Sequence, residues 1–112
     1  MKPRDNSLMA VEDVSELVAY QTGSVVSRVI LKTPGGTVTA FAFDAGEGLS
    51  EHSTPHDALV QVTEGEALIT IGGERHIVRA GQMLKLPGSV PHAVTATQRF
   101  TMLLTMLKSQ AA

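Results

Sequence analysis

Short apolar runs separated by turn residues occupy the chain from residue 24 to residue 107. Most of these runs alternate apolar and polar positions, as strands with one buried face do. Glycine or proline interrupts nearly every run, and Gly72-Gly73 has the composition of a two-residue hairpin turn. The predicted strands cover residues 24–32, 37–44, 57–63, 66–71, 74–79, 82–86, 92–97 and 100–107. This spacing indicates an all-β antiparallel sandwich or barrel.

The pattern differs before residue 24. Apolar positions there recur at helical spacing, namely Leu8, Val11, Val14 (or Leu17) and Val18. They predict a short amphipathic helix capped by Asn6 or Ser7. Residues 45–55 are predicted to be a loop. We therefore expect an N-terminal tail and short helix over 1–23, followed by a single β domain over 24–112.

Composition narrows the function classes. The chain has 112 residues, of which 43% are hydrophobic, and a mass of 11.8 kDa, which suits one domain with its own core. Nine Lys and Arg against eleven Asp and Glu argue against a nucleic-acid partner. The absence of cysteine excludes disulfides and thiolate chemistry. Without a signal-like start or a long apolar run, we expect a cytoplasmic protein with no membrane partner.

In each of two segments, a histidine stands at a set distance from a glycine or a proline. Their fixed positions are Gly46, His52 and Gly65 in residues 46–65, and Gly81, Pro87 and His92 in residues 81–92. The segments resemble the two motifs of the cupin superfamily, G-x5-H-x-H-x3,4-E-x6-G and G-x5-P-x-G-x2-H-x3-N. The resemblance spans residues 37–107. It implies a cupin-type double-stranded β-helix, that is, a jelly-roll barrel of two antiparallel sheets, commonly dimeric, with its site inside.

The chain departs from these motifs at the usual metal ligands. Thr54 stands where the family has its second histidine, Ala58 where it has glutamate, and Ala96 where it has asparagine. His52 and His92 are retained. The resemblance thus implies the fold more strongly than the chemistry.

His56 is a candidate third metal ligand, two residues after Thr54. Alternate strand positions share a face, so His56 faces the same way as His52 if the strand stays regular, although Pro55 would disturb that alternation. The candidate metal set is therefore His52, His56 and His92, and a divalent Zn, Ni, Mn or Fe ion suits imidazole ligands. The other interpretation makes His52 and His92 hydrogen-bonded pocket residues and His56 a rim residue.

Around the histidines we expect a small apolar pocket with one hydroxyl, lined by Thr54, Ala58, Val60, Val94 and Ala96. Two functions then compete, and a structural dimer without a ligand is a weaker third. One is a metal-binding cupin that binds or acts on a small organic molecule, and the other is a metal-free cupin that binds or senses such a molecule without catalysis. Whether the chain is an enzyme stays open. Asp57 is predicted to bond a loop backbone or to orient a neighbouring histidine rather than to serve as an acid or base.

Apolar residues on both faces of segments 24–32 and 100–107 need more cover than one small barrel supplies. The sequence therefore predicts a homodimer.

Overall fold

The computed structural model describes residues 10–108, whose regular secondary structure is almost entirely β-strand. Its strands are β1 (Val25–Thr33), β2 (Gly36–Phe43), β3 (Gly48–His52), β4 (Asp57–Glu64), β5 (Glu66–Ile71), β6 (Glu74–Arg79), β7 (Met83–Leu86), β8 (His92–Thr95) and β9 (Phe100–Leu107). One 3₁₀ turn, η2 (Val14–Glu16), precedes them. The all-β class predicted from alternation is confirmed.

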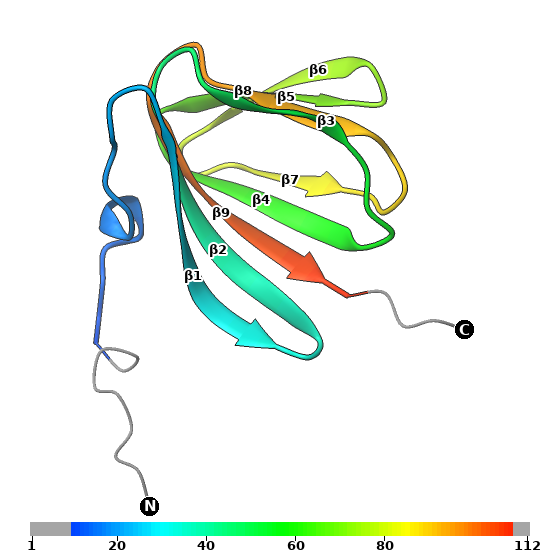
Figure 1. Cartoon of the computed structure of the whole chain (residues 1–112), viewed down its shortest axis with the longest axis horizontal. Helices are drawn as coiled ribbons and strands as arrows, with labels where there is room; N and C mark the ends of the chain where they lie inside the picture. The colour runs from blue at the N-terminus through cyan, green and yellow to red at the C-terminus, as the bar shows by residue number, and fades with distance from the viewer. Residues whose placement is uncertain (1–9, 109–112) are drawn as a thin grey trace, which may run out of the picture.

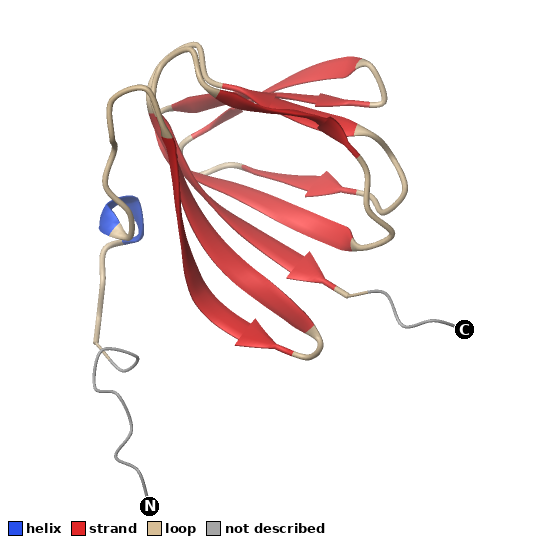
Figure 2. Ribbon diagram, in the orientation of Figure 1, coloured by secondary structure: helices blue, strands red, loops and turns tan. Residues whose placement is uncertain are grey.

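The strands form two antiparallel sheets that face each other (Figures 1 and 2). The five-stranded sheet has the order β1-β2-β9-β4-β7, and the four-stranded sheet has the order β3-β8-β5-β6. Within residues 10–108 the hydrogen-bonded ladders remain two separate sheets rather than one closed barrel. The two sheets enclose one apolar core between their inner faces.

Residues from both sheets fill this core. Phe43 and Phe100 are fully buried, and their rings stack with centroids 4.5 Å apart at an interplanar angle of 9°. From the opposite sheet, Ile69 and Ala67 are also fully buried. Burying each large side chain contributes roughly 1.5–3 kcal/mol, so these contacts between the sheets are the main stabilising term.

The predicted hairpin turn at Gly72-Gly73 is confirmed. Ile71 pairs with Glu74, and the two glycines between them have φ of 54° and 86°. Positive φ at both central residues defines the turn whose twist matches that of the flanking strands. Glycine is needed here because other residues rarely adopt this conformation.

One strand falls where a loop was predicted. Residues 45–55 contain β3, which pairs with β8. Leu49 is the only large apolar residue in β3, and glycine, serine and glutamate are weak strand formers. The prediction was wrong because pairing with β8, rather than local propensity, makes this segment a strand.

The predicted N-terminal helix is also wrong. Among its described residues only η2 is helical, and Asp13 before it makes no side-chain cap; Leu8 and the caps Asn6 and Ser7 lie outside the described residues. Valines are modest helix formers, and an isolated helix this short is marginal. Instead, Arg28 of β1 donates to the Leu17 carbonyl at 3.0 Å and to Glu12 at 3.2 Å. The segment thus lies against the five-stranded sheet as an irregular strap.

Residues 10–108 form no helix that is long and apolar enough to cross a membrane.

Candidate functional site

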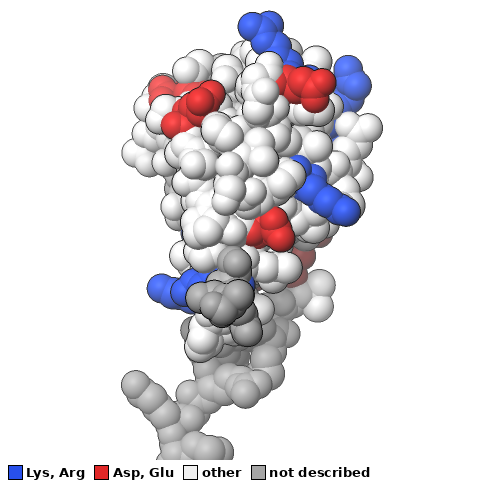
Figure 3. All heavy atoms as spheres, turned by 90° about the vertical axis from the view of Figure 1, so that its right-hand side faces the viewer, with Lys and Arg blue, Asp and Glu red and all other residues white. Residues whose placement is uncertain are grey.

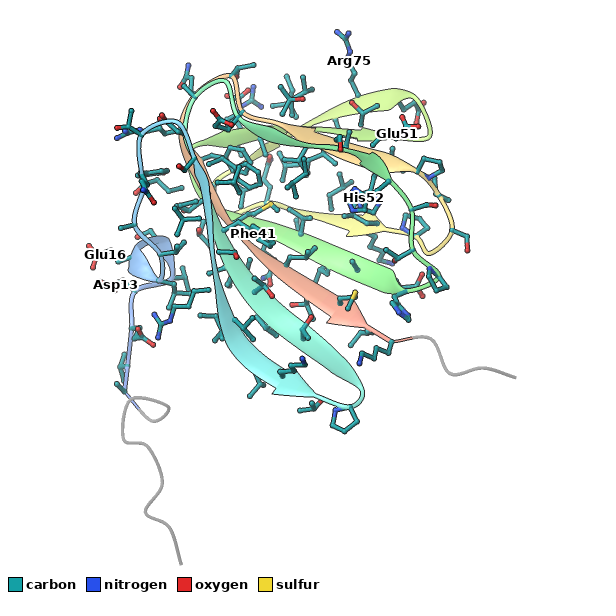
Figure 4. All side chains as sticks on the ribbon, in the orientation of Figure 1. Asp13, Glu16, Phe41, Glu51, His52 and Arg75 are labelled. Carbon is teal, nitrogen blue, oxygen red and sulfur yellow. The ribbon has the colours of Figure 1, made fainter. Side chains whose placement is uncertain are left out.

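An irregularity in β3 brings the two motif histidines together. Leu49 pairs with Val94 and His52 pairs with His92, so two residues of β3 oppose the single residue Ala93 of β8. Such a β-bulge shifts the alternation by one position. It places His52 on the same inward face as Leu49, which packs against the core. Figure 4 shows His52 between the two sheets.

The two imidazole rings contact each other edge to face. Their centroids are 4.3 Å apart at an interplanar angle of 66°. The Nδ1 of His52 lies 2.9 Å from the Ser50 carbonyl oxygen, and the Nδ1 of His92 lies 3.4 Å from the Val90 carbonyl oxygen. A carbonyl only accepts, so each Nδ1 carries the proton and each Nε2 keeps its lone pair.

Each Nε2 is left to bind something else. Among residues 10–108, the hydrogen bonds of both rings all run through Nδ1. His52 is exposed and His92 is half-buried. We call this end of the sandwich the mouth; it includes the two rings and the loops of residues 53–56 and 87–91.

The environment favours neutral His92. Partial burial lowers the pKa of His92, and the neighbouring His52 lowers it further, against a weaker opposite effect of the Val90 carbonyl. A neutral imidazole is the form that binds a metal or accepts a hydrogen bond. The site is therefore suited to accept a cation or a donor group near neutral pH.

Backbone bonds join the two mouth loops. Ser89 donates from its amide to the Thr54 carbonyl at 2.6 Å, and Gly88 donates to Asp57 Oδ1 at 2.8 Å. The second bond confirms the predicted loop-bonding role of Asp57. Gly88 leaves no room for a side chain, because a Cβ there would lie 2.6 Å from the Pro55 carbonyl oxygen. The loops thus hold each other and fix the approach to His92.

The sequence reasoning missed one mouth residue. Ser89 has φ of 67° and is the only residue other than glycine with positive φ in the described chain. It stands at the glycine of the P-x-G step in the second motif. That departure from glycine in a left-handed turn was the available signal.

The third candidate ligand lies apart from the strand face. β3 ends at His52, and His56 sits in a bend before β4. Its backbone amide donates to Thr54 Oγ1 at 3.2 Å, and the Thr54 hydroxyl faces the His56 carbonyl oxygen at 3.4 Å. No three acidic or imidazole side chains of residues 10–108 are grouped as a metal would need. The structure therefore brings together His52 and His92, without His56.

The five predicted pocket residues lie at different depths. Val60, Val94 and Ala96 are at most 3% exposed and belong to the packed core. Ala58 is half-buried and pairs with Leu86 and Met106. Thr54 lies in the mouth loop, with its hydroxyl engaged by His56. Only Ala58 and Thr54 are therefore positioned near the surface, and a ligand pocket lined by all five stays a prediction.

His76, which no motif claims, lies on the inward face of β6. It pairs with Ile69 and its Nε2 is 3.9 Å from Glu74. Its neighbour Arg75 points away from the sandwich (Figure 4).

Solved structures from several bacteria are similar to this chain. A conserved protein of unknown function from Streptococcus pyogenes has 34% identity and a TM-score of 0.85, over 91% of this chain and 90% of that one. A cupin 2 conserved barrel domain protein from Leptotrichia buccalis has 40% identity and a TM-score of 0.80, over 83% of this chain but 45% of that one. A cupin superfamily protein from Desulfitobacterium hafniense has 26% identity and a TM-score of 0.84, over 88% and 90%.

None of the curated proteins matches the chain closely enough to count as a relative. The family model described as the cupin domain matches residues 40–107. This match includes all strands from β3 to β9 and both histidines of the mouth. Together with the 34% identity to the streptococcal protein over most of both chains, it shows that this chain belongs to the cupin family.

Proposed function

We propose that this cupin binds one divalent transition metal ion at the mouth, through Nε2 of His52 and Nε2 of His92, and holds a small organic molecule beside it. The observation that carries the proposal is the arrangement of the two rings. They contact each other, and each directs Nδ1 to a backbone carbonyl, which makes Nε2 of each ring the nitrogen available to a metal. Imidazole nitrogen is a preferred ligand of Zn, Ni, Mn and Fe ions.

The protein groups around the pair have definite roles in this proposal. The Ser50 and Val90 carbonyls hold the proton on Nδ1 and orient the rings, as carbonyl partners of metal-binding histidines do. Partial burial keeps His92 neutral, so that little proton release accompanies binding. When bound, the ion supplies a Lewis acid with positions open to a small ligand.

His56 is left out of the proposed set. To join, it would have to leave the bend that Thr54 fastens on one side and that the bond between Asp57 and Gly88 restrains on the other. We expect two protein ligands, with water or the organic molecule completing the coordination.

A second candidate function is binding of a small molecule without metal. Ala58, at the position of the family's glutamate, presents a methyl group beside Leu86 and Met106 instead of a carboxylate. Figure 3 faces the mouth end, where charged side chains of both signs are scattered among uncharged ones. Two hydrogen-bonding imidazoles at the mouth also suit an uncharged or weakly acidic organic ligand.

Calorimetric titration of the chelator-treated full chain with Zn²⁺ and with Ni²⁺ tests the proposal. We expect one equivalent to bind, with affinity reduced at least tenfold in both His52→Ala and His92→Ala. His56→Ala is the matched control and is expected to bind like the wild type. At a free metal concentration 100 times Kd, binding raises the free energy of unfolding by about 2.7 kcal/mol and Tm by about 10 °C.

Two results would overturn the metal proposal. One is a folded wild type that takes up no metal, and the other is uptake that neither histidine substitution changes. If the metal-free protein instead binds members of a small-acid library, with imidazole shifts at His52 and His92 by NMR, the second function is supported.

A further inference from the structure

The edge strands of the two sheets differ in how regular they are. They are β1 and β7 of the five-stranded sheet and β3 and β6 of the four-stranded sheet. The register shifts within β1 and within β3, and β7 has only four residues. By contrast β6, at the free edge of its sheet in Figure 1, keeps one unbroken register from Glu74 to Arg79. Bulges and short strands are the usual protection of a sheet edge, so β6 is the edge most open to pairing.

Hydrogen bonds show which backbone groups of β6 face away from its sheet. The Arg79 amide donates to Gln82 Oε1 at 2.8 Å, and the Gln82 amide donates to the Arg79 carbonyl at 2.8 Å. The backbone of Arg79 is therefore directed away from β5. Residues directed toward and away from the partner alternate along an antiparallel strand. The backbone N–H and C=O groups of Ile77 and Arg75 thus also face away from β5, and Gln82 closes only the Arg79 end of this edge.

Across a hollow from β6, strand β7 presents a second open edge. The Val62 amide of β4 donates to the Gln82 carbonyl at 3.1 Å, so by the same alternation the backbone of Met83 is directed away from β4. The hollow between the two edges has a volume of about 610 Å³ and is lined by residues 75–78 and 81–84. It gives room for the inward side chains of a strand added beside β6.

The side chains along β6 define what an added strand must carry. On the outer face, Arg75 points away from the sandwich (Figure 4) and has no ion-pair partner among the described residues. Ile77 on the same face is 54% exposed. Toward the hollow, His76 of β6 and Leu84 of β7 are both half-buried. The outer face thus offers a cation beside an exposed apolar side chain, and the hollow offers Leu84, which packs against the core.

We propose that the edge of β6 binds an extended segment of an acidic partner protein, which adds to the four-stranded sheet as an antiparallel strand. Main-chain hydrogen bonds to Ile77 and Arg75 give the affinity, and alternate side chains of the segment give the specificity. Antiparallel pairing reverses the order of the residues. The segment therefore has an apolar residue opposite Ile77, then a small residue that enters the hollow beside His76, then a carboxylate opposite Arg75.

The charges favour a different protein over a second copy of this chain. Two β6 edges paired about Ile77 would set Arg75 against Arg79 at both ends, and like charges directly opposite each other destabilise a strand pair. Pairing about His76 would set Arg75 against Ile77 and leave the arginine without a carboxylate. An acidic segment instead places opposite charges across the new pair, which stabilises it.

The edge of β6 is remote from the mouth. β6 and β3, the strand that ends at His52, are the two opposite edges of the same sheet. A segment bound at β6 therefore does not compete with a ligand at the mouth. Strand addition is independent of the metal proposal, and either can fail without the other.

Nuclear magnetic resonance of the full chain, titrated with a synthetic peptide, tests the proposal. The peptide is Ser-Thr-Val-Ala-Glu-Thr-Ser with blocked ends, which carries the apolar, small and acidic residues in the required order. We expect the amides of Ile77 and Arg75 to shift, and their hydrogen exchange to slow about tenfold on binding. The amide of Arg79 should change less, because Gln82 already accepts its hydrogen bond.

Reversing the charges separates a specific pair from general attraction. Arg75→Glu should weaken binding of this peptide about tenfold, because repulsion replaces attraction. A peptide with lysine in place of glutamate should bind the wild type weakly and Arg75→Glu well. Lys32→Glu makes the same change of sign at an exposed position of β1, in the other sheet, and should bind the acidic peptide like the wild type.

Ile77→Pro tests the main-chain bonds. It removes an amide that faces away from β5, so the ladder within the sheet keeps its hydrogen bonds, and peptide binding should be lost. Ile77→Thr keeps the amide and is the matched control, which should still bind. Circular dichroism shows whether each variant is folded, and if Ile77→Pro does not fold, the charge reversal at Arg75 still decides.

Three results would overturn the proposal. The first is a folded wild type in which neither amide responds to about 5 mM peptide. The second is binding that is indifferent to the sign of the charge at Arg75. The third is protection of the Ile77 amide that grows with protein concentration in the absence of peptide, which would identify a second copy of the chain as the occupant of this edge.

Discussion

At the scale of single residues, His92 is the side chain on which most of the proposed chemistry depends. It contacts His52, donates to the Val90 carbonyl and lies half-buried at the mouth. Burial is the largest cause of its lowered pKa, and the electrostatic influence of the neighbouring His52 is the second. The two causes can be separated, because only the second depends on the neighbouring ring.

We therefore expect His52→Asn to raise the pKa of His92 without restoring it to the ordinary value of 6.5, since burial remains. Imidazole chemical shifts between pH 4 and pH 8 measure this directly. His76→Asn removes a histidine from another strand and should leave the titration of His92 unchanged. A pKa of His92 at or above 6.5 in the wild type would contradict the assignment.

The same shift predicts how stability depends on pH. Because the pKa of His92 is lower in the folded than in the unfolded chain, the unfolded chain binds more protons between those two values. Folding stability should thus fall as pH decreases through 6.5 and level off below the folded pKa. The urea midpoint of the wild type minus that of His92→Asn should fall as pH decreases through this range, and parallel curves would refute this.

At the scale of elements, alternation predicted the strands well because most have one buried face. β4 and β9, for example, were placed to within a residue at each end. β3 was missed because only pairing with β8 stabilises it, and its bulge cannot be read from the spacing. His52 and His92 were found through motif spacing, whereas His56 was proposed on an alternation that ends at His52.

The turn between β4 and β5 requires glycine for a second reason besides its backbone conformation. Gly65 has φ of 76°, and a Cβ there would lie 2.5 Å from the Arg99 carbonyl oxygen and 3.0 Å from Phe100 Cβ. Gly81 has φ of 87° with nothing within 4 Å of its Cβ position. The positive φ disfavours a side chain at both positions, but only a side chain at Gly65 would also clash with the backbone of another segment.

Gly81→Ala should therefore lower the free energy of unfolding by about 1 kcal/mol, the usual cost of a left-handed residue other than glycine. Gly65→Ala should lower it by roughly 2–4 kcal/mol, because the Arg99–Phe100 segment must also shift. Urea unfolding of both variants under one condition measures the difference. Equal losses would show that the close approach at Gly65 has no energetic consequence.

At the scale of the whole molecule, a polar cluster ties the N-terminal strap to the strand connections. Tyr20 donates to Glu64 Oε1 at 2.6 Å, and the Arg99 guanidinium lies 5.2 Å from the centre of the Tyr20 ring. Arg99 Nε in turn donates to Asp44 Oδ1 at 2.7 Å. Burial, and then Glu64, raises the pKa of Tyr20, so its hydroxyl stays a donor. These four residues lie far apart in the sequence, and no spacing pattern predicted that they would meet.

Asp44 is the group through which this cluster should respond to acid. The hydrogen bond from Arg99, and then that from the Gly23 amide, lowers the pKa of Asp44 from 3.8 to about 2. Since the folded value is the lower one, the stabilising contribution is complete above pH 3.8 and is lost as pH falls toward 2. Asp44→Asn lacks this contribution at every pH.

The urea midpoint of the wild type should accordingly lie well above that of Asp44→Asn at roughly pH 6. This difference should shrink steadily below about pH 4, because Asp44 becomes protonated between its unfolded and folded pKa values. Asp13→Asn removes a carboxylate from the strap that makes no cap, and it should show no such narrowing. A difference that is constant from pH 6 to pH 2 would mean that Asp44 keeps its charge, or its role, independently of Arg99. Narrowing confined to Asp44→Asn would show that the strap is held to the two-sheet body by an ionised carboxylate.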